Sequence, residues 1–392
     1  EMCIRDRVYW AAKTFRHEKL LEKPKNAALI MSDEEINVAD EFCEGYKSFL
    51  DKAKTEREAC SEAIRLAEEA GFTEYDQTAD YKAGDKFYYN NRDKSIILAV
   101  MGEESLAEGI RLAAAHIDSP RLDLKQHPLY EDEELALFKT HYYGGIKKYQ
   151  WTAIPMALHG VIVKADGTGV EVNIGEDEGD PVFCVTDLLI HLATEQMKRP
   201  LAQGIKGEEL NLLVGSRPFR DDKVSKKVKL NIMKILNEKY GITESDFISA
   251  ELEIVPAFKA KDLGFDRSMV GGYGQDDRVC AYPALMAILG CDKPKHTCMT
   301  ILTDKEETGS DGNTGLNSSY LPYFIDDIAA LQGLKGHNVI SRSLCLSADV
   351  NAAVDPTFSD VTESRNASKI NYGVVAVSYT HLRAHETTLH LV

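Results

Sequence analysis

The sequence lacks an excess of basic residues, a long apolar run and a phosphate-binding loop. Its formal net charge of −17 argues against a nucleic-acid partner, because phosphate binding needs clustered cations. A membrane-spanning helix needs roughly 20 consecutive apolar residues. Neither such a run nor a signal peptide with a basic start and an apolar core is visible. We therefore expect a soluble protein with no nucleic-acid and no membrane partner.

The cysteines also lack a pattern. All eight are scattered along the chain, and none forms a CxxC pair. Several lie in apolar runs, as reduced thiols of a protein core do. This distribution fits a reducing compartment better than a disulfide framework, so the sequence predicts a cytoplasmic protein.

Both ends of the chain look foreign. Residues 1–7 and 378–392 resemble translated sequencing-adapter read-through, and we exclude them from fold reasoning. The remaining sequence then stops inside an apolar run, residues 370–377, which we interpret as a strand. We therefore expect a chain that is truncated at its C-terminus.

The periodicity of the apolar residues predicts an α/β fold with a mixed central sheet flanked by helices. Ser32 and Glu35 form a capping-box pattern at the start of the first long helix. A second helix is expected over about residues 55–70. Strands are expected at five places: residues 88–91, 95–101, 110–115, 297–302 and 344–347.

Residues 126–263 differ in sequence pattern from the segments on either side, and we interpret them as an inserted, mainly β second domain. The first domain would then comprise residues 31–125 and 264–377. A hairpin is predicted around Asp166-Gly167. The other elements expected in the insert are helices at residues 187–197 and 224–240 and a strand at residues 251–258.

A pair of adjacent carboxylates, Glu306 and Glu307, follows the predicted strand at residues 297–302. Open α/β sheets place their sites at such strand ends. Neighbours on an extended chain point in opposite directions, so one carboxylate could bind a cation while the other handles protons. Taken alone, a Glu-Glu pair is more often a solvated turn.

His116 and Asp118 follow the predicted strand at residues 110–115 and share one side of an extended chain. An aspartate behind a metal-bound histidine is a common arrangement, although a lone HxD is more often a surface strand end. Asp276 and Asp277, in GGYGQDDR, precede a helix predicted at residues 279–289. The glycines lack the GxGxxG spacing of a dinucleotide site, so Asp276 is either a helix cap or a metal ligand.

Asp349 follows the predicted strand at residues 344–347 and is either a ligand or a turn former. Histidine together with carboxylates suits divalent cations. One bridging carboxylate with separate terminal ligands would hold two ions about 3.5–4 Å apart, as in two-metal hydrolases.

These motifs, in this order, resemble those of the aspartyl aminopeptidase family of dinuclear zinc exopeptidases. The resemblance runs from about residue 40 to 377 and includes the segment ALFKTHYYGGIKKY. It implies hydrolysis of the N-terminal, possibly acidic, residue of a peptide by a metal-activated water. It also implies two divalent ions, most simply Zn²⁺ with Co²⁺ or Mn²⁺ as alternatives, and a homo-oligomer of dimers assembled partly through the inserted domain.

The resemblance also assigns roles to individual residues. His116 and Asp349 would bind one ion, Glu307 the other, and Asp276 both, while Glu306 would be the general base and Asp118 the carboxylate behind the site. It further suggests a strained, possibly cis, peptide bond between Asp276 and Asp277. The family's last ligand, a histidine near the C-terminus, has no counterpart here. We interpret the histidines of the terminal segment as non-functional: His381, His385 and His390.

Two alternatives remain open at this point. One is another dinuclear exopeptidase, such as a glutamyl or leucyl aminopeptidase or a carboxypeptidase. The other is an inactive scaffold, either by descent or because this chain is truncated.

Overall fold

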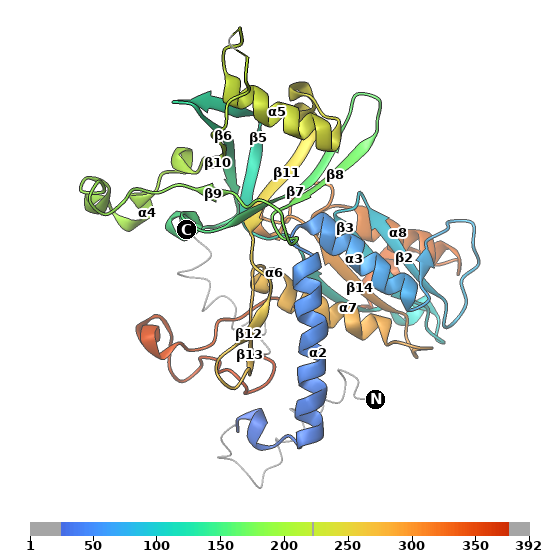
Figure 1. The fold of residues 1–392 in the computed structure, drawn as a ribbon. Helices are drawn as coiled ribbons and strands as arrows, with labels where there is room; N and C mark the ends of the chain where they lie inside the picture. Colours follow the sequence, from blue (N-terminus) through green and yellow to red (C-terminus); the bar gives the residue numbers. More distant parts are fainter. Residues whose placement is uncertain (1–24, 222, 376–392) are drawn as a thin grey trace. The chain divides into compact units, whose positions relative to one another are not determined.

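The computed structural model describes residues 25–221 and 223–375 (Figure 1). The predicted foreign segments and the three histidines of the C-terminal one lie outside these residues. The chain divides into two compact units: residues 46–348 form one, and residues 1–45 with 349–392 form the other. Helix α2, Asp33–Lys52, starts in the second of these units and ends in the first.

The first long helices begin where their capping residues predict. Ser32 N–H donates to the Glu35 carboxylate over 2.9 Å, and Glu35 N–H donates to the Ser32 hydroxyl over 3.3 Å. Helix α3, Glu56–Glu69, has the equivalent capping box between Thr55 and Glu58. Such a cap stabilises a helix by about 1 kcal/mol because it satisfies backbone N–H groups that lack an intrahelical partner.

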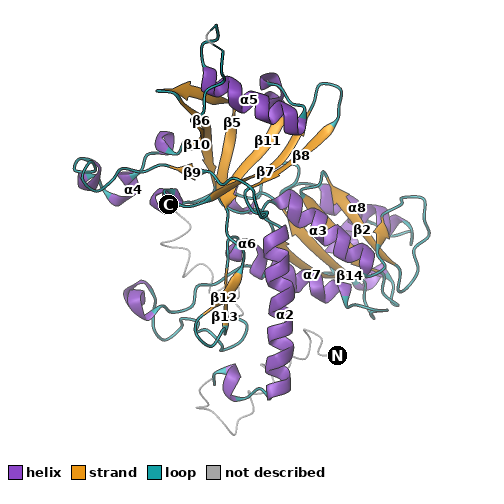
Figure 2. Cartoon of the chain, viewed as in Figure 1, coloured by secondary structure: helices purple, strands orange, loops and turns teal. Residues whose placement is uncertain are grey.

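The unit formed by residues 46–348 contains a six-stranded sheet, which lies at the right of Figure 2. Its parallel pairs are β1 with β2, β14 with β4 and β4 with β15, and its antiparallel pairs are β2 with β3 and β3 with β14. The predicted mixed sheet is therefore present. In spatial order its strands are β1 (Thr73–Glu74), β2 (Lys86–Asn91), β3 (Ser95–Val100), β14 (Cys298–Thr303), β4 (Arg111–His116) and β15 (Leu344–Ser347).

Helices cover both faces of this sheet, as the alternation along β3 shows. Ile96 and Leu98 belong to one apolar cluster with α3 and helix α7, Ala281–Leu289. Ile97 instead belongs to another cluster with helix α8, Tyr320–Ala330. Successive side chains of a strand point to opposite faces, so a strand buried on both faces is a nearly continuous apolar run, as β3 is from Ile96 to Val100. A short helix, α9 (Gly336–Ile340), follows α8.

A second, seven-stranded sheet is antiparallel throughout and is built from residues 121–256. Its own apolar cluster includes residues of helix α5, Lys227–Tyr240. The predicted hairpin is β7 with β8. The inserted-domain boundaries at residues 126 and 263 stay a prediction. In spatial order the strands are β8 (Gly169–Ile174), β7 (Met156–Val163), β11 (Ala250–Pro256), β5 (Arg121–Asp132), β6 (Leu135–Tyr143), β10 (Leu212–Gly215) and β9 (Cys184–Val185).

Short elements connect these parts. Strands β12, Lys261–Leu263, and β13, Met269–Gly271, pair as a two-stranded antiparallel ribbon. Helix α4 is a single turn, Leu201–Gly204. The 3-10 turns are Ala27–Leu29, Leu106–Glu108, Lys148–Trp151, Gln196–Lys198, Gly207–Glu209, Glu244–Ser249, Glu306–Thr308 and Pro356–Val361.

Three predictions about local structure were wrong. Residues 187–197 form turns instead of a helix. An isolated helix of this length is marginal unless its apolar face packs, and Leu189 and Leu192 are each 70% exposed. The described part of the predicted terminal strand, residues 370–375, forms turns and irregular chain. The helix predicted at residues 279–289 is interrupted at Cys280, because Pro283 has no N–H to donate to the carbonyl of Val279.

No helix among the residues that the structure describes is long and apolar enough to cross a bilayer.

Candidate metal centre

The site begins where two parallel strands end side by side. Thr303, the last residue of β14, is in register with His116, the last residue of β4. Ile117 N–H then donates to the Thr303 carbonyl over 2.8 Å. The segments that follow, with Asp118 on one side and Glu306 on the other, therefore leave the sheet at the same edge.

The imidazole ring of His116 is held in one orientation by Asp118, which faces one ring nitrogen, while Asp276 faces the other. It is only 5% exposed. Its Nδ1 lies 3.2 Å from the Asp118 carbonyl oxygen and 3.5 Å from Asp118 Oδ1, while its Nε2 lies 4.0 Å from Asp276 Oδ1. A proton on Nδ1, directed at Asp118, leaves Nε2 facing the Asp276 carboxylate. This is how a metal-ligating histidine is usually oriented, with its second nitrogen hydrogen-bonded to a carboxylate or carbonyl.

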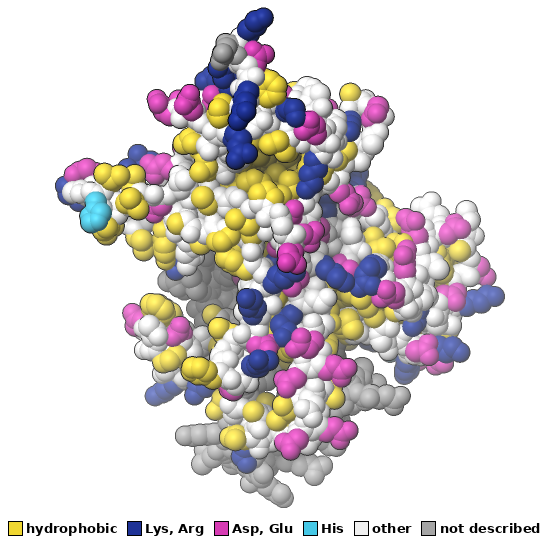
Figure 3. Space-filling view, viewed as in Figure 1, with side chains coloured by type: hydrophobic (Ala, Val, Ile, Leu, Met, Phe, Trp, Pro, Cys, Tyr) yellow, Lys and Arg dark blue, Asp and Glu magenta, His cyan; other side chains and the backbone are white. Residues whose placement is uncertain are grey.

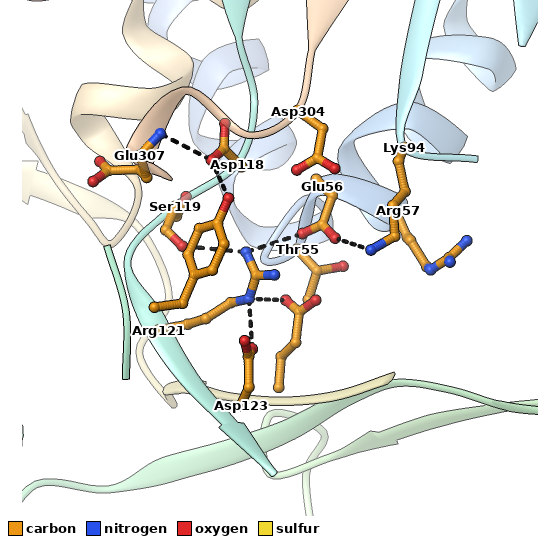
Figure 4. Close-up of polar contacts among 12 residues, drawn as sticks. Thr55, Glu56, Arg57, Lys94, Asp118, Ser119, Arg121, Asp123, Asp304 and Glu307 are labelled. Atoms are coloured by element: carbon orange, nitrogen blue, oxygen red, sulfur yellow. Dashed lines mark hydrogen bonds and ion pairs between the residues drawn. The ribbon is translucent and has the colours of Figure 1, made fainter. Parts of the chain in front are cut away.

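Asp118 is fully buried and accepts hydrogen bonds at both carboxylate oxygens. Figure 4 shows the bond that Glu307 donates. Glu306 N–H donates to Oδ1 over 3.0 Å, and Glu307 N–H donates to Oδ2 over 3.1 Å. The Tyr143 hydroxyl donates to Oδ2 over 2.6 Å. Burial alone raises the pKa of Asp118, but the bonds from His116, Tyr143 and Glu307 N–H outweigh it and hold the pKa below its usual range. Asp118 is therefore an anion that fixes the loop carrying the two glutamates.

The sequence analysis expected this loop to be extended at Glu306 and Glu307, but it is not. Glu306 and Glu307 open a 3-10 turn after Lys305, whose φ is 74°. Successive residues of such a turn diverge by about 120°, so the two side chains still point in different directions. The reason for the divergence is the turn and not strand alternation.

Asp276 and Asp277 lie in the first turn of helix α6, Gln275–Val279, but in different surroundings. Asp276 is 56% exposed. Asp277 is buried, with Oδ2 3.5 Å from the guanidinium of Arg278 and Oδ1 3.9 Å from His116 Nδ1. The peptide bond between them is trans, since the described residues contain no cis peptide bond, and neither residue has a positive φ. The suggested cis bond is therefore not found.

The electrostatics of the carboxylates fit a bound cation. Burial raises the pKa of Glu307 to about 8, and the nearby charges of Asp277, Asp118 and Glu306 contribute to the rise. A group of carboxylates this close repels itself unless a cation is present. A divalent ion beside His116 Nε2 and Asp276 would remove that repulsion, and imidazole with carboxylate oxygen is a donor set that zinc accepts.

Asp349 comes soon after β15 in the sequence and belongs to the unit formed by residues 1–45 and 349–392. Val350 N–H donates to its carboxylate over 2.7 Å. Its role as a ligand stays a prediction.

Sequence reasoning missed two features of the site. Tyr143 was seen only as part of an aromatic and glycine-rich phrase, although its hydroxyl bonds Asp118. The buried Arg278 was not considered, although its guanidinium donates to the Ser119 hydroxyl. The residue after Tyr143, Gly144, also lies close to the site: its φ is 71°, and a Cβ there would lie 2.8 Å from Glu307 Oε2.

A buried histidine backed by aspartate, facing a second carboxylate at a sheet edge and beside two glutamates, defines a metal-dependent hydrolase. The family profile described as Aminopeptidase I zinc metalloprotease (M18) matches residues 49–391. The chain belongs to this M18 family, and it is a metal-dependent aminopeptidase.

Individual relatives agree with this assignment. A probable M18 family aminopeptidase 1 of Clostridium acetobutylicum is 51% identical over 372 residues, which are 93% of this chain and 80% of that protein. The crystal structure of an M18 aminopeptidase from Thermotoga maritima is 44% identical and matches with a TM-score of 0.85, covering 90% of this chain and 78% of that one. A crystal structure of aminopeptidase I from C. acetobutylicum matches with a TM-score of 0.83 and 48% identity, covering 90% of this chain and 78% of that one.

A more distant structure shares the fold alone. The S. cerevisiae mApe1 dodecamer is 20% identical, with a TM-score of 0.68, and the match covers 85% of this chain and 76% of that one.

Proposed function

We propose that this aminopeptidase removes acidic N-terminal residues from peptides and uses two zinc ions to do so. The observation that carries the proposal is the placement of His116 between Asp118 and Asp276, with its Nε2 4.0 Å from the Asp276 carboxylate. Following the family resemblance, we assign His116 and Asp349 to one ion, Glu307 to the other, and Asp276 to both. The acidic preference rests on the resemblance to aspartyl aminopeptidases.

Zinc bound at these ligands would lower the pKa of a bound water and polarise the scissile carbonyl. Glu306 is the general base: it accepts the proton of the attacking water and delivers it to the leaving amine. Its backbone N–H is bonded to the buried Asp118 carboxylate, which supports a fixed position for the residue. Asp118 does not contact the peptide in this scheme; it orients His116 and the glutamate turn.

We also propose that the protein self-associates through the chain around α4 and β9. Apolar side chains gather there on the molecular surface (Figure 3). They are at least half exposed: Val182, Leu188, Leu189, Ile190, Leu192, Met197 and Leu201. An exposed apolar patch of this kind commonly marks a protein interface, and the yeast relative is a dodecamer.

A cytoplasmic location is supported by the thiols. Cys60, Cys184 and Cys345 are free cysteines, and burial raises the pKa of Cys60 to about 12. Reduced thiols persist in reducing compartments.

The experiment compares peptides that differ only at the N-terminal residue. The zinc-loaded protein should cleave an N-terminal aspartyl or glutamyl peptide faster than the matching leucyl peptide, and it should not cleave the N-acetylated forms. Removing zinc with a chelator should abolish cleavage, and adding zinc should restore it. A faster reaction with the leucyl peptide would overturn the acidic preference, and cleavage of acetylated peptides would overturn the exopeptidase assignment.

A further inference from the structure

Tyr143 reaches the candidate metal centre from the seven-stranded sheet. It is the last residue of β6, whereas the other groups that face the Asp118 carboxylate come from the six-stranded sheet: His116 ends β4, and the N–H groups of Glu306 and Glu307 lie in the loop after β14. Burial and the charge of Asp118 raise the pKa of the Tyr143 hydroxyl well above its usual value. The hydroxyl therefore stays protonated and donates. The second sheet thus provides one of the hydrogen bonds that fix Asp118.

The ring of Tyr143 is held in turn by Arg121. The two residues are cross-strand partners on β5 and β6, and the guanidinium carbon of Arg121 lies 3.9 Å from the centre of the Tyr143 ring. A guanidinium stacked on an aromatic face at this distance is attractive, and more so when it is buried. Arg121 is 4% exposed.

Arg121 is itself fixed by carboxylates on three sides (Figure 4). Its Nη1 lies 3.2 Å from Glu56 Oε2, and its Nε lies 2.9 Å from Asp123 Oδ1 and 3.1 Å from Glu253 Oε2. Glu56 is the first residue of α3 and is also paired with Lys94 over 3.0 Å. A buried guanidinium with partners on this many sides has little freedom to change its rotamer, so the plane on which Tyr143 stacks is fixed.

We propose that Tyr143 and Arg121 are positioning residues for the metal centre. Arg121 fixes the ring of Tyr143, the Tyr143 hydroxyl fixes the carboxylate of Asp118, and Asp118 orients His116 and the turn of Glu306 and Glu307. The seven-stranded sheet thereby contributes to metal binding and catalysis within its own chain. This inference rests on the proposed function of the site.

The first test is Tyr143→Phe, which removes only the hydroxyl and leaves the ring on which Arg121 stacks. Tyr130→Phe is the matched control, because Tyr130 lies on β5 of the same sheet and pairs with Leu137, well along the strand from Tyr143. Partners that orient metal ligands are typically worth 10–100-fold in metal affinity or activity. We expect Tyr143→Phe to lower kcat and weaken zinc binding by roughly this factor, with KM little changed. Zinc affinity is measured on the zinc-stripped protein by competition with a chromophoric chelator.

The second test is Arg121→Lys, alone and combined with Tyr143→Phe. Lysine keeps the positive charge but cannot stack as a plane. If Arg121 acts through the hydroxyl of Tyr143, the lysine substitution lowers kcat in the wild-type background and has a much smaller effect in the Tyr143→Phe background. Equal effects in both backgrounds would show that Arg121 does not act through Tyr143. If Arg121→Lys fails to fold, as judged by circular dichroism, Tyr143→Phe alone decides the proposal.

Wild-type and Tyr130→Phe proteins separate this inference from the proposed function. If both bind zinc and cleave peptides, and Tyr143→Phe matches them in kcat and in zinc affinity, the positioning role is wrong while the function stands. If wild-type protein neither binds zinc nor cleaves unblocked peptides, the proposed function itself fails.

Discussion

Thr303 and His116 are register partners on two parallel strands, although they are far apart in the sequence. Parallel neighbours end at the same edge of a sheet, so the histidine motif after β4 and the glutamate motif after β14 emerge together. The hydrogen bonds from Glu306 N–H and Glu307 N–H to the two oxygens of Asp118 then join these motifs directly. This pairing explains why neither motif can be assigned a function by itself.

The assignment of Glu306 as the general base predicts the effect of Glu306→Gln. The amide cannot accept a proton, so peptide hydrolysis should fall by roughly 10²–10⁴. Both zinc ions should remain, as measured by metal analysis of the purified variant. The comparison is Glu307→Gln, which should lose one ion. Loss of zinc from the Glu306 variant together with normal residual turnover would exchange the roles of the two glutamates.

Asp276 and Asp277 should also differ. Asp276→Ala removes a ligand shared by both ions and should empty both positions, whereas Asp277→Asn should retain them. The physical reason lies in their surroundings: Asp276 faces His116 Nε2, and the buried Asp277 faces Arg278. Metal content and zinc affinity check this prediction. Two tightly bound equivalents in the Asp276→Ala protein would refute the bridging assignment.

Gly144 and its neighbour Gly145 offer a matched pair. A Cβ at Gly144 would lie 2.8 Å from Glu307 Oε2, and the φ of 71° is unfavourable for alanine, whereas a Cβ at Gly145 meets open space. Gly144→Ala should cost roughly 1–2 kcal/mol from the left-handed backbone alone and should weaken zinc binding by displacing Glu307. Gly145→Ala should have little effect on either. Thermal unfolding and chelator competition measure both variants, and similar zinc affinities would show that Gly144 is not required for the position of Glu307.

The ionisation of Glu56 should make the free energy of unfolding depend on pH in the acid range. Burial by itself raises the pKa of Glu56, but Arg121 and Lys94 outweigh it and lower the pKa to about 2. A carboxyl group with a lowered pKa contributes stability above its unfolded pKa of about 4.5, and that contribution is lost as the pH falls towards 2. Glu56→Gln should therefore be clearly less stable than wild type at pH 7, and the difference should shrink near pH 3.5.

The measurement is the urea midpoint of unfolding, followed by tryptophan fluorescence. The exposed Glu178 provides the control, because Glu178→Gln should match wild type at both pH values. A difference between Glu56→Gln and wild type that stays constant from pH 7 to pH 3.5 would contradict the assigned ion pairs.

Much of the fold was predictable because its signals are local. The capping boxes at Ser32 and Thr55 set the starts of α2 and α3, and the apolar runs that became β3, β14 and β4 needed no knowledge of their partners. Prediction failed where the outcome depended on a partner. Residues 187–197 have helical periodicity but no packed face. The interruption at Cys280 is a separate, local case: Pro283 is visible in the sequence, and the prediction of one continuous helix did not take its missing N–H into account.

The sequence by itself determined the candidates for the chemistry: His116, Asp118, Asp276, Glu306 and Glu307 are polar residues near predicted strand or helix ends, and the family resemblance implied their roles. The tertiary structure alone decided how the unit formed by residues 46–348 holds them. The order of strands in the sheet brings the ends of β4 and β14 together, and the second sheet directs Tyr143 at Asp118. The physical reason is that a hydrogen bond between side chains on different sheets depends on register and strand order, which are set by packing across the whole unit and leave no periodic signal along the chain.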